Sequence, residues 1–134
     1  MKQNPEDVIP AYVRAFETLE PNAVVPFYSL PCVFIAPSSM TVISDVDSAR
    51  ALVSLLIEQA KSQNYRRTEI LGNMEVRRLA ANLASVAGAY VRFDANDREI
   101  MRFGFTYVMR DDGDRWRIIV ALAHDLPPTS GLAA

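Results

Sequence analysis

The strongest constraint on the fold is a change in hydrophobic period near residue 64. Before it, apolar residues recur every three to four positions, which indicates amphipathic helices. After it, apolar and polar residues alternate, which predicts four strands at 68–79, 83–93, 99–109 and 115–124. The intervening segments AAN, DAND and DDGD have the length and composition of hairpin loops. Helices followed by a long antiparallel meander predict a single α+β domain.

Three helices and two short strands are predicted ahead of the meander. The first helix follows a cap at Asn4 or Asp7 and runs to about Leu19. The second is short, begins at Pro21 and is disrupted near Pro26. The third begins at 44–47 and ends at 61–63, and the segments CVFIA and MTVIS before it predict two short strands. We therefore expect one domain over residues 1–126 with a sheet of about six strands, followed by a polar tail at 127–134.

Composition excludes several function classes. The 134 residues carry a net charge of −2, so no overall positive field attracts nucleic acid or anionic lipid. The start of the chain has no secretory h-region, and the longest apolar run, 118–123, is too short to span a bilayer. A lone cysteine, Cys32, cannot form an internal disulfide and suits a reducing cytoplasm. One Cys and one His cannot supply a structural zinc site, so we expect a cytoplasmic protein without metal or organic cofactor.

Counting outward from each hairpin predicts which side chains share a face of the sheet. A loop at 111–114 pairs Arg110 with Arg115 and places Met101 opposite His124. One face then has an aromatic end and a polar end, as expected for a pocket with a floor and a mouth. The candidate pocket residues on this face and on the first helix are Tyr12, Phe16, Tyr90, Met101, Phe103, Phe105, Tyr107 and His124. A one-residue bulge would reverse every assignment beyond it.

The only histidine, His124, is the candidate for proton transfer. Its neighbour Asp125 points to the opposite face of the strand and cannot be its partner. Histidine titrates near neutral pH, and Tyr90 lies on the same predicted face, so these two are the candidate catalytic residues. The alternative is a half-solvated histidine at a strand end. Arg92 is predicted opposite Glu99, which we interpret as a cross-strand surface pair, with an anion clamp as the alternative.

The other face of the sheet is predicted to be smooth and apolar. Its side chains would form an exposed patch, which a soluble monomer rarely leaves bare. We therefore expect a homodimer through this face, with contacts at Thr106, Val108, Ile119 and Ala121.

Two stretches, AYVRAFETLEPNAVVPFYSLPCVFIAP and DGDRWRIIVALAHD, resemble the opening and the end of SnoaL-like members of the NTF2-like superfamily. The resemblance covers roughly residues 5–126, and the most similar group known to us is bacterial, with no assigned activity. It implies a curved sheet wrapped around a helix-lined pocket, and frequent dimers through the outer face. Its relatives include ketosteroid isomerases, polyketide cyclases and scytalone dehydratases, alongside members that only bind or scaffold.

The enzymes of that superfamily need an inward carboxylate or histidine base near a hydrogen-bond donor. The resemblance implies that His124, Tyr90 and Tyr12 would take these parts. No inward aspartate is predicted on the four long strands, which departs from the enzymes' pattern. Two functions remain open. The first is binding of a small, mostly apolar, cyclic molecule, extended to cofactor-independent isomerase, cyclase or dehydratase chemistry. The second is a non-catalytic dimeric interaction or assembly module whose cone is filled by its own side chains.

Overall fold

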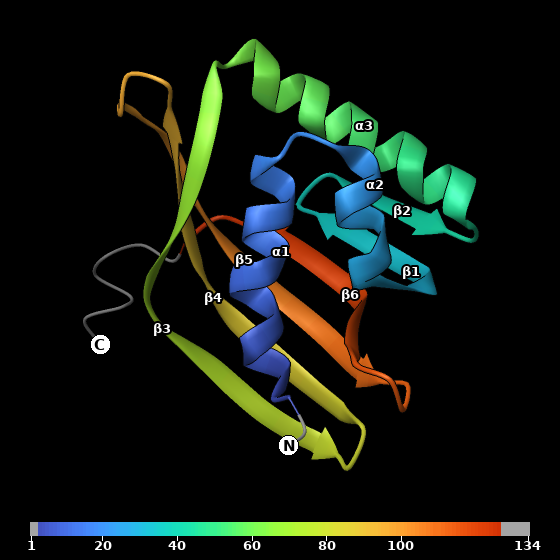
Figure 1. Ribbon diagram of the computed structural model, residues 1–134. Helices are drawn as coiled ribbons and strands as arrows, with labels where there is room; N and C mark the ends of the chain where they lie inside the picture. The colour runs from blue at the N-terminus through green and yellow to red at the C-terminus, as the bar shows by residue number, and fades with distance from the viewer. Residues whose placement is uncertain (1–2, 127–134) are drawn as a thin grey trace.

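The computed structural model describes residues 3–126, which form helices packed on one curved, six-stranded sheet (Figure 1). The tail predicted at 127–134 lies outside the described residues. The helical elements are the 3₁₀ turn Pro5–Asp7, α1 Val8–Glu17, α2 Pro21–Val24, the 3₁₀ turn Val25–Phe27 and α3 Val46–Ser62. The strands are β1 Tyr28–Ala36, β2 Ser39–Ile43, β3 Tyr65–Ala80, β4 Leu83–Asp94, β5 Glu99–Asp111 and β6 Trp116–His124. Within these residues no helix is both long and apolar enough to cross a membrane.

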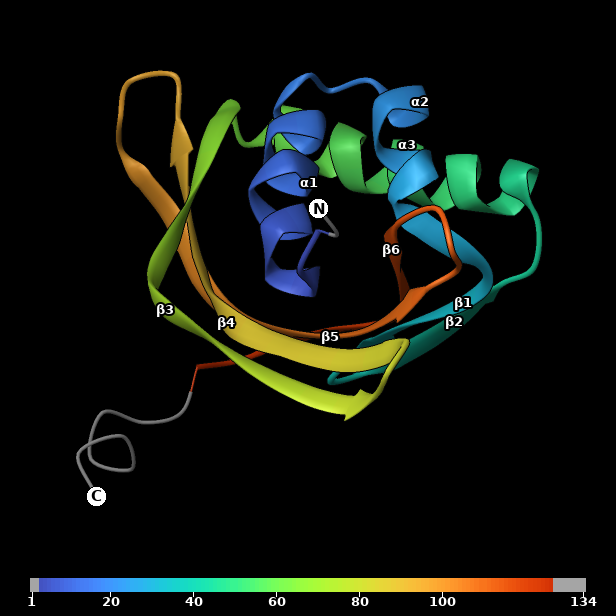
Figure 2. The ribbon, with the colours of Figure 1, turned by 60° about the horizontal axis from the view of Figure 1, so that its bottom comes forward.

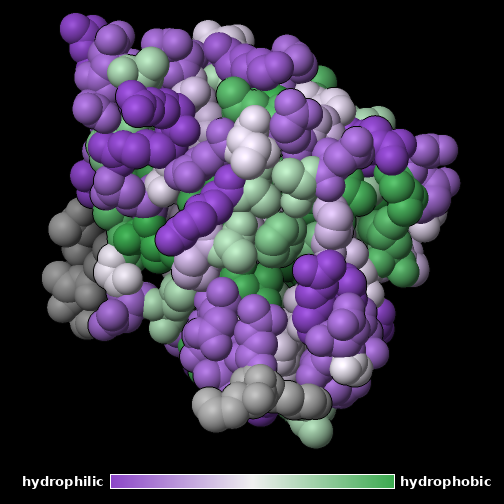
Figure 3. Space-filling view, viewed as in Figure 1, coloured by the Kyte–Doolittle hydropathy of each residue, from purple (hydrophilic) through white to green (hydrophobic). Residues whose placement is uncertain are grey.

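The sheet has the order β2-β1-β6-β5-β4-β3, and only the β1–β6 pair is parallel. It curves around α1, while α2 and α3 lie across its open side, so the sheet does not close into a barrel (Figure 2). Polar side chains cover most of the helical side of the molecule, with apolar side chains visible between them (Figure 3). The predicted α+β cone, with three helices on about six mainly antiparallel strands, is confirmed.

Each long helix forms where its sequence supplies a boundary and an apolar stripe. The Asp45 carboxylate accepts the Ser48 backbone N–H at 2.8 Å, which satisfies a free donor at the start of α3. From there α3 buries Ala49, Val53, Ile57 and Ala60 at helical spacing. In α1 the buried stripe is Val8, Ile9, Val13 and Phe16. These two stripes pack on the concave face of the sheet and form the core with it.

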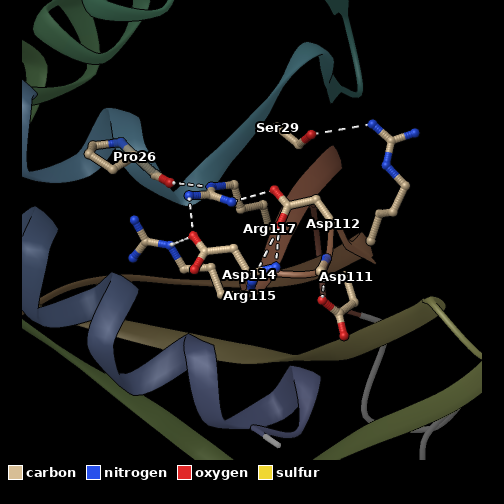
Figure 4. Close-up of polar contacts among 9 residues, drawn as sticks. Pro26, Ser29, Asp111, Asp112, Asp114, Arg115 and Arg117 are labelled. Atoms are coloured by element: carbon tan, nitrogen blue, oxygen red, sulfur yellow. Dashed lines mark hydrogen bonds and ion pairs between the residues drawn. The ribbon is translucent and has the colours of Figure 1, made fainter.

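The β5–β6 hairpin differs from the predicted register. The Asp112 carboxylate accepts the backbone N–H groups of Asp114 and Arg115, each at 3.2 Å, and Gly113 takes a φ of +97° (Figure 4). The loop therefore covers 112–115, and the pair that closes it is Asp111–Trp116 rather than Arg110–Arg115. A two-residue displacement keeps every side chain on its face.

Arg117 ties this loop to the chain before β1. Its Nε donates to the Pro26 carbonyl at 3.1 Å, and its guanidinium forms ion pairs with Asp112 and Asp114 (Figure 4). On the other side of the hairpin, Arg110 donates to the Ser29 hydroxyl at 3.2 Å. The end of the meander is thereby held against the start of the β1–β2 hairpin.

A β-bulge follows two residues beyond Arg117. Met109 pairs with Ile118, but Val108 pairs with Val120, so Ile119 is one residue too many for the ladder. An extra residue in one strand reverses the direction of every side chain beyond it. The predicted faces are therefore wrong for the remainder of β6.

Two predicted placements change as a result. Ala121, expected on the outer face, pairs with the inward Tyr107 and is 5% exposed. His124, expected on the inner face, pairs with Gly104 and faces outward. A Cβ on Gly104 would lie 2.3 Å from the imidazole, which places the ring on the side of the sheet away from the neighbouring Phe105. Thr106 and Val108, whose strand is unbroken here, lie on the outer face.

Candidate functional site

A cavity of about 450 Å³ lies between the concave face of the sheet and the helices. Its walls come from α1, from the inner side of α3, from the β1–β2 hairpin and from the centre of the meander. Six of the residues singled out as pocket candidates lie along these walls: Tyr12, Phe16, Met101, Phe103, Phe105 and Tyr107. Tyr90 also lines the cavity. The alternation of strand residues explains why the candidates of β4 and β5 come together.

Aromatic rings from β4 and β5 pack together along one wall of the cavity. The rings of Tyr90 and Phe105 are stacked, with centroids 4.2 Å apart and planes at 19°, and Tyr107 follows at 4.8 Å from Phe105. Phe105 lies directly over Gly88, since a Cβ there would come within 2.8 Å of the ring. The observed register, with Tyr90 opposite Phe103 and Gly88 opposite Phe105, is two residues from the predicted one. The faces are unaffected, because the displacement is even.

Four tyrosines that line the cavity have their hydroxyls in two hydrogen-bonded pairs. The hydroxyls of Tyr12 and Tyr28 are 2.5 Å apart, and those of Tyr90 and Tyr107 are 3.0 Å apart. Burial raises the pKa of Tyr12 to about 12, and it raises the pKa values of Tyr28, Tyr90 and Tyr107 as well. All four are therefore neutral at physiological pH and can donate hydrogen bonds. The sequence offered no signal for Tyr28, which precedes the segment predicted as a strand.

Arg92 is the cation of the cavity wall. It pairs with Thr68 and Met101 on the neighbouring strands. Its guanidinium carbon lies 4.9 Å from the ring centroid of Phe16, 5.1 Å from Phe103 and 5.5 Å from Tyr65. Burial lowers the pKa of this guanidinium, although arginine stays charged in proteins.

The predicted surface pair between Arg92 and Glu99 is wrong. The Glu99 carboxylate is held by Arg102 through two hydrogen bonds of 2.9 Å, and Phe93 is its cross-strand neighbour. Arg92 points instead toward the helices, and its buried Nε has no hydrogen-bond partner among the described residues. The site therefore contains a half-buried cation, which the sequence analysis interpreted as half of a surface pair, with an anion clamp as the alternative.

The two candidate catalytic residues are not brought together. His124 Nε2 lies 3.0 Å from the Thr106 hydroxyl on the outer face, and its Nδ1 lies 3.0 Å from the Asp125 carbonyl. Tyr90 lies on the inner face, so the sheet separates its hydroxyl from the imidazole. His124 is among the residues that line the cavity, although its imidazole bonds to the outer-face Thr106, and the single carboxylate among the described lining residues is the exposed Asp125. Between residues 3 and 126 no group of three His, Cys, Asp or Glu side chains converges on a position for a metal ion.

Solved structures with the same fold support this architecture. A proposed association domain of calcium/calmodulin-dependent protein kinase type II from Thiobacillus denitrificans superposes with a TM-score of 0.72 at 17% identity, covering 95% of this chain and 98% of that one. An NTF2-like protein with a cystatin-like fold from Novosphingobium aromaticivorans has a TM-score of 0.72 at 11% identity, with 95% and 83% covered. A ketosteroid isomerase-like protein from Erwinia carotovora has a TM-score of 0.61 at 18% identity, with 92% and 95% covered. These similarities establish the fold alone.

The family comparison covers nearly the whole described chain. No curated protein matches the sequence. The family model described as NTF2-like protein (DUF6841) matches residues 4–126, which include every helix and strand of the cone. The chain therefore belongs to this NTF2-like family.

Proposed function

We propose that this domain binds a small, mostly apolar, ring-containing molecule in the cavity of its cone. The supporting observation is a cavity of about 450 Å³ with a stacked aromatic wall. Ligand pockets typically measure about 300–1,000 Å³ and combine apolar walls with a few polar groups. Here the tyrosine hydroxyls and Arg92 are those polar groups. A ring-containing ligand can pack against this wall and accept a hydrogen bond from one of these groups.

Binding fits the lining better than either alternative. A module with a filled cone would leave little space, whereas this cavity has room for a molecule of one to three rings. Isomerase, cyclase or dehydratase chemistry needs a base that reaches the ligand. Among the described lining residues the carboxylate of Asp125 is exposed at the rim, and the His124 imidazole faces away. Without a base inside the cavity, the arrangement favours recognition over proton transfer.

The test is to titrate the chain with 2-naphthamide, a neutral two-ring probe, and to measure its Kd by isothermal titration calorimetry. Leu56 of α3 lines the cavity, so Leu56→Trp should fill part of it and weaken binding at least about tenfold. Leu55, its neighbour on the same helix, is 66% exposed and points away, so Leu55→Trp is the matched control. Absence of binding to the wild-type chain, or equal binding to both variants, would contradict the proposal.

We also propose that the outer face of the sheet pairs with a second copy of the chain. This face carries the apolar side chains Val33, Ile35, Met40, Val42, Val108, Val120 and Leu122, placed there by the strand pairing. Met40 and Val42 are 67% and 62% exposed in the single chain, and patches of this kind usually mark an interface. Light scattering should give twice 14.9 kDa for the wild type and for Leu55→Glu, but 14.9 kDa for Val42→Glu. A wild-type monomer at micromolar concentration would refute the dimer.

A further inference from the structure

Arg92 differs from the other half-buried arginines of the described region, Arg67 and Arg117, in forming no ion pair there. The arginines that form ion pairs are Arg50, Arg67, Arg77, Arg102, Arg115 and Arg117, all near the surface. Glu17 reaches the same part of the fold, but its carboxylate accepts the Thr68 backbone N–H at 3.0 Å and forms no ion pair with Arg92. A buried cation is costly unless a charge or hydrogen bonds compensate it. Arg92 is therefore only partly compensated in the free chain.

The surrounding rings stabilise the positive charge of the guanidinium but leave its Nε–H donor without an acceptor among the described residues. Phe16, Tyr65 and Phe103 surround its carbon at 4.9–5.5 Å and attract the positive charge through their π faces. The π faces do not, however, accept two parallel hydrogen bonds from the guanidinium N–H groups, as a carboxylate would. The buried Nε still lacks an acceptor among the described residues, although it belongs to the edge that binds a carboxylate through two parallel hydrogen bonds.

The position of Arg92 defines where an anionic group would lie. Its side chain lines the cavity beside Thr68 of β3, with Gln59 of α3 and Gln63 just after this helix on the wall of the same cavity. Met101, its partner on β5, is 40% exposed, so this end is close to solvent. A ligand could therefore place its ring against the aromatic wall and its charged group at Arg92.

We propose that the ligand of this cavity is an aromatic or alicyclic monocarboxylate whose carboxylate pairs with Arg92. This inference rests on the proposed small-molecule function and names the class of molecule. One cation without an acidic partner matches one negative charge. The planar guanidinium matches a planar carboxylate better than a point charge would.

The test compares two probes that share a ring system and differ in charge, 2-naphthoate and 2-naphthamide. On the wild-type chain, calorimetry should give at least about tenfold tighter binding for 2-naphthoate. Arg92→Met should abolish this preference, because 2-naphthoate should lose at least about tenfold more affinity than 2-naphthamide does. Arg66→Met removes an exposed arginine of β3 and should keep the preference, which controls for overall charge.

The outcomes separate this inference from the function on which it rests. If 2-naphthamide binds and 2-naphthoate binds no better, the cavity proposal stands and the role of Arg92 is refuted. A preference that survives in Arg92→Met refutes it as well. If neither probe binds the wild type, both proposals fail. Should Arg92→Met not fold, Arg92→Lys keeps the charge without the planar fork and should reduce the preference, whereas an unchanged preference would overturn the proposal.

Discussion

Replacement of Gly88 by alanine tests the packing of the aromatic wall. A Cβ at this position would lie 2.8 and 2.9 Å from two atoms of the Phe105 ring and 3.3 Å from Met74 Cγ. Phe105 is 1% exposed and lies between Tyr90 at 4.2 Å and Tyr107 at 4.8 Å, so its ring cannot shift sideways without displacing one of them. Overpacking of a core costs about 1–3 kcal/mol. Alanine also restricts the backbone of the unfolded chain more than glycine does, which stabilises the folded state by about 0.4–1 kcal/mol. We therefore expect Gly88→Ala to lower the free energy of unfolding by about 1–2 kcal/mol.

Gly104→Ala is the matched control for this substitution. Its Cβ would meet the His124 ring even more closely, at 2.3 Å. That imidazole is half-buried at the end of β6, so it can turn away at the loss of its hydrogen bond to Thr106. One such bond contributes about 0.5–1.5 kcal/mol, which the gain from the unfolded chain largely offsets. The net change should stay within about 0.5 kcal/mol.

Urea unfolding followed by the fluorescence of Trp116, the single tryptophan, measures both variants. In the double variant Gly88→Ala/Phe105→Leu the smaller side chain makes room for the new methyl group, so the effect of Gly88→Ala should largely disappear. A Gly88→Ala chain as stable as the wild type would refute the reasoning. So would a Gly104→Ala chain that is the less stable of the two.

Three further predictions concern charged and hydroxyl groups. Asp45→Ala should lower the free energy of unfolding more than Asp47→Ala, because only Asp45 caps the Ser48 N–H. That bond lowers the pKa of Asp45 below 3.8, so its stabilisation is present above pH 3.8 and is lost as pH falls through the lowered pKa. The urea midpoints of the wild type and Asp45→Ala should therefore differ at neutral pH and converge as the solution is made progressively more acidic. Burial raises the pKa values of all five tyrosines. At pH 10, where the tyrosines of the urea-unfolded chain are half ionised, the folded chain should therefore show no phenolate absorbance, and its free energy of unfolding should fall as pH rises from 10 toward 12. Phenolate absorbance from the folded chain at pH 10 would contradict the buried hydroxyl pairs. His124→Ala should change the Kd for 2-naphthamide by less than about twofold, whereas a loss of about tenfold would place the imidazole in the cavity.

The order of helices and strands could be predicted because each element carries its own local signal. Asp45 and the spacing from Ala49 to Ala60 define α3 without reference to any other part of the chain. The alternation of β5 likewise places Phe103, Phe105 and Tyr107 on one face whatever the partner strand does. Predictions that depend on a single element were therefore accurate.

Predictions that depend on two strands were less accurate, because side-chain chemistry in the loop decides the pairing. DDGD is compatible with a loop at 111–114 or at 112–115, and the hydrogen bonds of Asp112 select the second. No glycine or proline near Ile119 in the sequence predicts the bulge there. Its position follows from the packing of β6 between β5 and β1, which the sequence of β6 alone does not reveal.

The interpretation of Arg92 as half of a surface pair follows from Glu99, which lies at hairpin distance in the sequence. The alternation of β4 places Arg92 on the same face as Tyr90, which is information the sequence does contain. The rings that surround it, however, come from α1, β3 and β5, and only the folded chain brings Phe16, Tyr65 and Phe103 together. A basic residue on the inner face of a predicted strand is therefore a useful signal for a binding site. The presence of an acidic residue nearby in the sequence is a weaker signal for an ion pair.

The bulge that reverses β6 also accounts for the space inside the cone. In a regular ladder Val120, Leu122 and His124 would point at the helices from the centre of the sheet. With Ile119 inserted, Ala121 and Ala123 line the cavity instead, opposite the large rings of Tyr107 and Phe105. Bulges often re-aim side chains beside binding sites, and here one replaces bulky residues with methyl groups where the opposing strand is most aromatic. The same extra residue turns the imidazole away from the cavity. The polar groups that remain on the walls include neutral hydroxyls, the amides of Gln59 and Gln63 and the cation of Arg92, and the proposed binding of an anionic ring compound relies on this set.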